Sequence, residues 1–177
     1  MTYLPPETVL DLFRRAGWYP ERQVGAFLHD EHPGYVALSQ FEGLHVGSTG
    51  TGEVCAKSDI QFVLLPKDPQ VESWERFLDS ALVGVGEVHH AHGELWVSQD
   101  GRFFGRSAVH DAFYFEGDGF DEAMERLLLG RRSQPMLHPK QKSVTLYGVE
   151  YRRGHPDLYD PSSDRKQRRR KNERRKS

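Results

Sequence analysis

The chain of 177 residues contains one cysteine and no unbroken apolar run longer than four residues, such as Phe62–Leu65. A single thiol cannot form an internal disulfide or hold a zinc ion alone, and a membrane-spanning helix needs about 20 apolar residues. The N-terminal residues show no basic region followed by an apolar stretch, which a secretory signal would need. We therefore expect a protein of the reducing cytoplasm that has no membrane partner.

Charge is distributed unevenly along the chain. Residues 1–130 carry 9 Lys/Arg and 21 Asp/Glu, residues 131–160 carry 6 and 3, and residues 161–177 carry 9 and 2. The first segment therefore has a net charge of −12 and the last a net charge of +7. An acidic body repels nucleic acid and attracts basic proteins. With 37% hydrophobic and 28% charged residues, the overall composition is that of a soluble globular protein.

Apolar residues recur with the helical period in four segments, and short apolar or β-branched runs lie between them. Pro33 opens one helix, Pro66 ends one strand and Gly130 ends the last helix. Helices are predicted at 7–16, 33–41, 71–82 and 120–129, the last capped by Asp118, and strands at 44–46, 60–65, 83–88, 94–97, 102–104 and 112–115. This order predicts an α+β fold, a mainly antiparallel sheet with helices packed on it.

Three regions are predicted along the chain. Residues 1–131 form the folded domain, residues 132–160 form a linker with one extra strand at 143–151, and residues 161–177 form a disordered basic tail. The tail contains no hydrophobic residue, so burial cannot offset its ordering entropy. Its run Arg168, Arg169, Arg170 and Lys171 can neutralise phosphates, but no aromatic residue is interleaved to stack on bases. Alternatively, the tail folds back on the acidic body.

The histidine cluster His89, His90 and His92 is the most conspicuous candidate for metal chemistry. Together with Glu87 or Glu94 it could ligate zinc or manganese, which accept imidazole and carboxylate ligands. However, the cluster lies in a predicted turn and lacks the helical spacing of metalloprotease ligands. An exposed polar bend is the favoured interpretation, and no metal or other cofactor is predicted.

Other catalytic arrangements find little support. Cys55 has only Lys57 as a basic neighbour in sequence, so nothing indicates a thiol with a low pKa. The chain has no Gly-x-Ser-x-Gly motif, no Gly-Lys-Ser/Thr and no Gly-x-Gly-x-x-Gly leading into a helix. No catalytic residue is therefore predicted, and binding is favoured over catalysis.

Five segments follow one another in an order that is typical of one superfamily. They are Ala16–Pro20 with Arg22, Phe41–Leu44, Val85–Glu87, Asp100–Phe104 and Phe120–Gly130. Residues 5–131 thereby resemble the SUKH superfamily, and most closely its third family of bacterial immunity proteins, with Glu42 in place of a glycine and Phe104 in place of a tyrosine. The motif residues expected to hold the fold are Gly17, Trp18, Pro20, Arg22, Gly43, Leu44, Gly86, Glu87 and Gly101.

The resemblance implies a non-enzymatic protein that binds and neutralises a cognate toxin, often a nuclease, in polymorphic toxin systems of competing bacteria. A nuclease holds phosphates and is basic at its active site, so an acidic partner would dock there quickly and block substrate. The candidate toxin contacts are the carboxylates of Glu42, Asp59, Glu87, Glu94, Asp100, Glu116 and Asp118. Trp18 and Trp96 are expected in the core rather than as anchors.

Two alternatives from other functional classes are kept. One is an adaptor of the same fold that contacts nucleic acid through its basic tail, and the other is a metal-dependent hydrolase centred on the histidine cluster. The oligomeric state is left open.

Overall fold

The computed structural model describes residues 2–25, 31–107 and 109–161. The helices are α1 (Leu10–Arg15), α2 (Pro33–Phe41), α3 (Pro69–Leu78) and α4 (Phe120–Leu129). The central strands are β1 (His45–Val46), β4 (Ile60–Leu65), β5 (Leu82–Val88), β6 (Gly93–Ser98), β7 (Phe103–Ser107), β8 (Phe113–Gly117) and β9 (Gln134–Met136). Two short hairpins are β2 (Gly50–Thr51) with β3 (Ala56–Lys57), and β10 (Ser143–Leu146) with β11 (Val149–Arg152).

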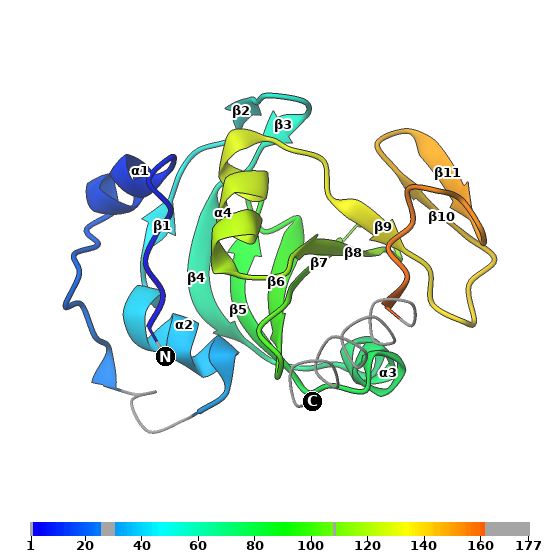
Figure 1. Ribbon diagram of the computed structural model, residues 1–177, viewed down its shortest axis with the longest axis horizontal. Helices are drawn as coiled ribbons and strands as arrows, with labels where there is room; N and C mark the ends of the chain where they lie inside the picture. Colours follow the sequence, from blue (N-terminus) through cyan, green and yellow to red (C-terminus); the bar gives the residue numbers. More distant parts are fainter. Residues whose placement is uncertain (1, 26–30, 108, 162–177) are drawn as a thin grey trace, which may run out of the picture.

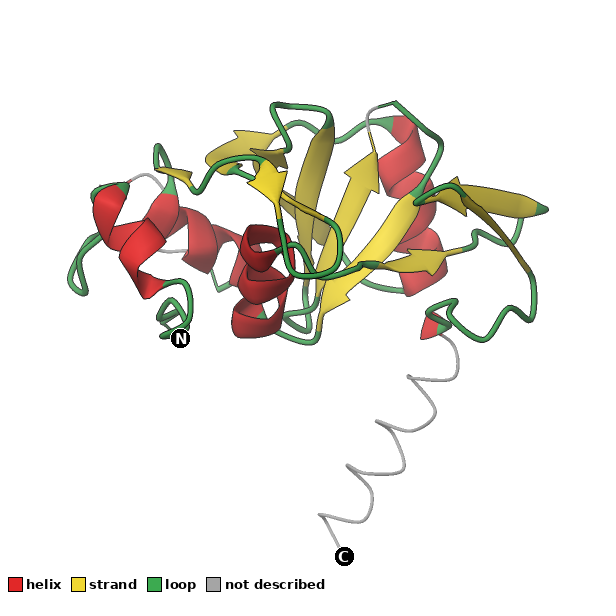
Figure 2. Ribbon diagram, turned by 90° about the horizontal axis from the view of Figure 1, so that it is seen from above, coloured by secondary structure: helices red, strands yellow, loops and turns green. Residues whose placement is uncertain are grey.

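The central strands form one antiparallel sheet in the order β1-β4-β5-β6-β7-β8-β9. Helices α1, α2 and α4 pack on one face of the sheet and helix α3 packs on the other (Figure 1 and Figure 2). The fold is α+β, as the sequence predicts. No helix among residues 2–25, 31–107 and 109–161 is long and apolar enough to cross a membrane.

Aromatic side chains fill the layer between the sheet and helices α1, α2 and α4. The ring of Phe41 stacks on Phe120 at 4.9 Å, and the ring of Phe13 meets Phe41 edge-on at 5.4 Å. Trp18 is 6% exposed and belongs to the same cluster. Burial of such rings stabilises a core by several kcal/mol in total, with a further contribution of about 0.5–1.5 kcal/mol from each well-oriented aromatic pair.

Helix α3 covers part of the opposite face of the sheet. The Asp68 side chain caps the helix by accepting hydrogen bonds from the backbone N–H groups of Gln70 and Val71, at 3.0 and 2.9 Å. From this helix Trp74 stacks on Phe113 at 4.7 Å. Trp96 is completely buried in the same layer. Trp18 and Trp96 are therefore core residues, as predicted.

Several element boundaries differ from the sequence predictions. Helix α1 begins at Leu10 rather than at residue 7, and helix α3 ends at Leu78 rather than at residue 82. Asp79 adopts a left-handed conformation with φ 52°, which ends α3 before Leu82 starts the next strand. The N-cap of α4 is Gly119, so the prediction that Asp118 caps this helix is wrong.

Part of the region after residue 131 belongs to the central sheet and is not a linker. Residues 134–136 form β9, which pairs with β8, so the linker prediction is wrong for this segment. The predicted single strand at 143–151 is a two-stranded hairpin, because Tyr147 and Gly148 reverse the chain with φ 53° and 73°. Further on, the Tyr159 ring stacks on Phe115 at 4.0 Å. The predicted tail lies outside the described residues from residue 162 onward, including Arg168, Arg169, Arg170 and Lys171.

Gly130 follows helix α4 and packs against the β2–β3 hairpin. Its φ is 73°, and a Cβ at this position would lie less than 3.0 Å from the Cys55 carbonyl oxygen and the Gly52 Cα. Its own carbonyl accepts hydrogen bonds from the N–H groups of Val54 and Cys55, both at 2.9 Å. This reversal is therefore open only to glycine.

We expect Gly130→Ala to lower the free energy of unfolding by about 2 kcal/mol, since it combines left-handed strain with backbone overlap. Urea-induced unfolding of the full chain measures this. The control is Gly25→Ala, because a Cβ on Gly25 would meet no other atom within 4 Å and is expected to change stability by less than about 0.5 kcal/mol. Equal stability of the two variants would contradict the prediction.

Candidate functional site

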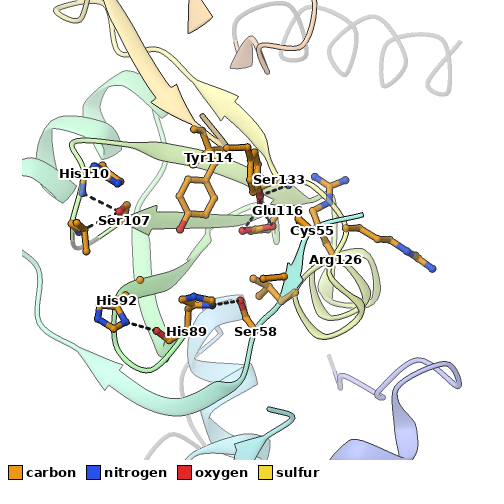
Figure 3. A pocket seen from close by; sticks show the side chains of 17 residues that line it. Cys55, Ser58, His89, His92, Ser107, His110, Tyr114, Glu116, Arg126 and Ser133 are labelled. Carbon is orange, nitrogen blue, oxygen red and sulfur yellow. Dashed lines mark hydrogen bonds between the residues drawn. The ribbon is translucent and has the colours of Figure 1, made fainter. Parts of the chain in front are cut away.

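A cavity of about 490 Å³ opens at one end of the sheet, beside helix α4. Its walls come from the β5–β6 turn, the β7–β8 loop, strand β8, the C-terminal half of α4 and both small hairpins. The side chains of Tyr114 and Glu116 lie on one side of it and those of His89 and His92 on the other (Figure 3). Segments distant in the sequence therefore meet at one polar cavity.

Strand β8 supplies the inner wall by simple alternation. Phe113 and Phe115 point toward the α3 side, so Tyr114 and Glu116 point toward the α4 side. The Tyr114 ring lies across Gly105 of the neighbouring strand β7, where any Cβ would overlap the ring, and its hydroxyl approaches Gly93 of strand β6. The two glycines thus leave the room in which the tyrosine ring lies flat.

Glu116 is completely buried at the inner end of the cavity. The hydroxyl of Ser133 lies 2.9 Å from both carboxyl oxygens. Burial raises the pKa of Glu116 to about 8, although the Ser133 hydrogen bond and the Arg126 guanidinium act in the opposite direction. The group is therefore mainly protonated at neutral pH. The prediction places Glu116 on an exposed acidic face, which is wrong, since the side chain is buried at the inner end of the cavity.

A chain of hydrogen bonds connects Glu116 to the C-terminal hairpin. The Ser133 N–H donates to the Tyr147 hydroxyl at 3.0 Å, and that hydroxyl donates to Ser133 Oγ at 3.2 Å. Burial raises the pKa of the neighbouring Cys55 thiol, with a hydrogen bond to Tyr147 acting in the opposite direction. A raised pKa is the reverse of what an activated thiolate nucleophile needs.

The histidine turn forms separate hydrogen bonds rather than a common centre. His89, His90 and Ala91 all have left-handed backbones, with φ of 55°, 54° and 63°. His92 Nδ1 lies 2.9 Å from the His89 carbonyl oxygen, and His90 Nε2 lies 2.9 Å from Thr49 Oγ1. Within the described part of the chain, no three His, Cys, Asp or Glu side chains are grouped so that they could hold a metal ion.

Asp59 lies beneath this turn. It is 4% exposed, and its carboxylate lies 2.7 Å from His45 Nε2 and accepts the His90 backbone N–H at 3.1 Å. Burial acts to raise the pKa of Asp59, but these hydrogen bonds outweigh it and hold the pKa below its usual value. Asp59 therefore stabilises the turn, and its prediction as an exposed toxin contact is wrong.

The remaining candidate carboxylates lie in separate places. Asp100 pairs with buried Arg102 at 2.9 Å in the β6–β7 turn, and Asp118 follows strand β8 at the same end of the sheet. Glu42 follows helix α2. Only Glu87 and Glu94 are direct neighbours, since they face each other in the register of β5 and β6. The seven candidates therefore do not form one continuous acidic face.

Glu87 and Glu94 belong to a polar row on the α3 side of the sheet. Aligned across five strands, the row is His45, Gln61, Glu87, Glu94 and Arg106. Arg106 lies 3.2 Å from Glu94 and 2.7 Å from Asp68. One guanidinium thus serves two carboxylates, while the Glu87 side chain makes no hydrogen bond or ion pair with the residues that the structure describes.

The motif residues sit at chain reversals and close contacts. The Arg22 guanidinium donates to the carbonyl oxygens of Gln40 and Glu42, at 2.5 and 2.7 Å, and so holds the end of α2. Among the motif glycines, Gly17, Gly43 and Gly101 have positive φ. A Cβ on the fourth, Gly86, would lie 2.8 Å from the Gln61 carbonyl oxygen. Leu44 is buried, whereas Pro20 is exposed in the loop after Trp18.

The molecule is thus a small α+β domain with two candidate sites, the polar cavity and the polar row. Its described parts contain no cluster of metal ligands. The sequence model of the SUKH-3 immunity protein family matches residues 34–130, more than half of the chain. The protein belongs to this family, and toxin-neutralising immunity is the function that membership implies. Searches of curated proteins and of solved structures found no significant match.

Proposed function

We propose that this immunity protein neutralises a basic, nuclease-type toxin domain by binding it at the β5–β6 end of the sheet and occluding its active site. The Glu87–Glu94 pair is the observation that carries the proposal. Like charges directly opposite each other in a sheet destabilise the fold by up to about 1 kcal/mol. A carboxylate pair that weakens the free protein is explained by a cation that a partner supplies.

The electrostatics of the polar row fit such a partner. Glu87, Glu94 and Asp68 bring three carboxylates near a single guanidinium, that of Arg106. Lysine and arginine side chains that hold phosphate in a nuclease would complete this set of charges. Occupation of those side chains by the immunity protein would exclude the nucleic acid. The proposal places this encounter in the cytoplasm, within a polymorphic toxin system.

The Glu87→Gln variant is expected to change stability and binding in opposite directions. Removing one of two facing charges should raise the free energy of unfolding by about 0.5 kcal/mol. The same change should weaken binding to the toxin domain about tenfold, because a close charge pair across an interface contributes roughly 1.5 kcal/mol or more. Urea-induced unfolding and titration calorimetry measure the two effects.

The partner for this experiment is the C-terminal toxin domain encoded in the adjacent reading frame. The matched control is Glu21→Gln, which removes one negative charge at an exposed position in the loop between α1 and α2. A control that binds as weakly as Glu87→Gln would show that only net charge matters. Failure of the wild-type protein to bind the toxin domain or to inhibit its nuclease activity would overturn the proposed function.

A further inference from the structure

The mouth of the cavity beside α4 is unusually apolar. Val109 and Tyr147, which line it, are 64% and 40% exposed, and Val54, next to the lining residue Cys55, is 63% exposed. Large exposed apolar side chains gathered around a depression are typical of protein-binding sites. Water-excluding contacts around a central pocket are also where binding energy is concentrated in interfaces.

The interior of the cavity presents a carboxyl group and an aromatic ring. Glu116 provides a carboxyl group at its inner end, and Tyr114 provides an aromatic face along one wall (Figure 3). A planar guanidinium can form two parallel hydrogen bonds with a carboxylate and can also stack on a tyrosine ring. An ammonium group has neither property, so this pair of side chains favours arginine over lysine.

The arginines next to the cavity are engaged by partners of their own. Arg126 pairs with Glu122 at 2.6 Å, and Arg131 pairs with Glu53 and Glu125 at 2.8 and 2.7 Å. The Arg132 guanidinium lies over the Tyr147 ring, 5.7 Å from its centroid. The charged or titratable groups that act on Glu116 or respond to it are Arg126 and Glu122 from α4, Tyr114 from β8, Tyr147 from the β10–β11 turn and Cys55 beside β3.

We propose that this cavity is a socket for one arginine side chain of the protein partner, with Glu116 as the group that pairs with its guanidinium. The proposal rests on the proposed function. When the guanidinium enters, the Glu116 carboxyl releases its proton to solvent and the resulting carboxylate pairs with the cation. His89 and His92 line the cavity, and Glu87 and Glu94 lie on the opposite face next to the same β5–β6 turn. A partner that binds on both sides of this turn would therefore contact the cavity and the Glu87–Glu94 pair.

A small probe tests the socket without the toxin. In the full-length protein, n-propylguanidinium should bind saturably with a dissociation constant in the range of about 10 mM, as expected for a ligand of this size. Carbon-13 NMR of the Glu116 carboxyl should show its pKa falling as the probe is added. Neutral n-propylurea should not bind, and Glu116→Gln should abolish binding of the cation. Equal binding of both compounds, or unchanged binding to the variant, would overturn the proposal.

The toxin domain separates the socket from the wider function. If toxin affinity for the wild type rises between pH 6 and 9 and this rise is lost in Glu116→Gln, the socket is supported, because the variant keeps the surrounding histidines. If the variant binds with an unchanged pH profile while Glu87→Gln binds weakly, the socket is wrong and the proposed function stands. If the toxin does not bind at all, the proposed function fails and the NMR titration alone decides on the socket.

Discussion

At pH 9 the Glu116→Gln variant is expected to be more stable than the wild type by about 5 kcal/mol, given that one pKa unit corresponds to roughly 1.4 kcal/mol. The reason is that Glu116 is ionised at this pH inside a fully buried site, where its charge is poorly solvated. Glutamine has the same shape, carries no charge and can keep a hydrogen bond with Ser133. Replacing the Glu116 carboxylate by an amide would thus stabilise the folded protein at high pH.

The pH dependence of this difference has a definite sign. The pKa of Glu116 is about 8 in the folded protein and near its ordinary value of 4.5 in the unfolded chain. Below pH 4.5 the carboxyl is protonated in both states, so the variant and the wild type should be equally stable. As pH rises from 4.5 to 8, the unfolded chain releases the proton first and wild-type stability falls. Above pH 8 the difference should be constant.

Urea-induced unfolding of both proteins at intervals from pH 4 to pH 9 measures this profile. Glu21→Gln serves as the control, because Glu21 is exposed and its removal should leave the pH dependence of the wild type unchanged. If the Glu116→Gln and wild-type curves run parallel over the whole range, Glu116 titrates as it does in water. The carboxyl would then be hydrated, and the cavity would not hold a neutral acid.

Local patterns in the sequence predict much of this fold. Proline at the start of α2 and glycine at the end of α4 act through their own backbone restrictions, and the apolar run of β4 is buried whatever lies around it. Such signals are contained within a few neighbouring residues. The helices and strands that depend on them lie at or near their predicted positions. Boundaries set by a left-handed residue such as Asp79 are not marked in the same way.

Local sequence patterns do not predict the cavity, because the burial of its side chains depends on segments that are distant in the sequence. Glu116 alternates with phenylalanines in β8 and looks like the solvent side of an edge strand. It is buried because α4 and Ser133, which lies 17 residues further on, cover it. The one local signal for the cavity is Gly105, which leaves space for the Tyr114 ring on the neighbouring strand. Pairing of β7 with β8 must be known before that glycine can be interpreted.

The net charge of −12 on residues 1–130 does not translate into one acidic surface. Asp59 and Asp100 contact side chains of their own fold, namely His45 and the buried Arg102. Net charge does not reveal which carboxylates are paired, since pairing depends on register and turn geometry. Glu87 and Glu94 became a distinct pair only when the alignment of β5 with β6 was known.

Combining Glu87→Lys with Glu94→Gln is expected to slow association with the toxin domain about 100-fold at low salt, within the range that separates steered from unsteered encounters. The change raises the net charge of the polar row by three units. Glutamine at position 94 can still accept hydrogen bonds from Trp96 and Arg106, so the sheet should remain folded. Stopped-flow measurements at increasing salt concentrations determine the association rate.

A second double variant, Glu21→Lys with Glu7→Gln, adds the same charge at exposed positions of the α1 region. At 0.1 M salt its association should slow far less than that of the first variant, because charges beyond about 10 Å from the contact are then screened. Toward 1 M salt the two association rates should converge, because screening then acts at the contact itself, while the dissociation rates change less. If both variants associate equally slowly, the total charge of the domain steers the toxin. A specific role for Glu87 and Glu94 would then be refuted, although the family function would be untouched.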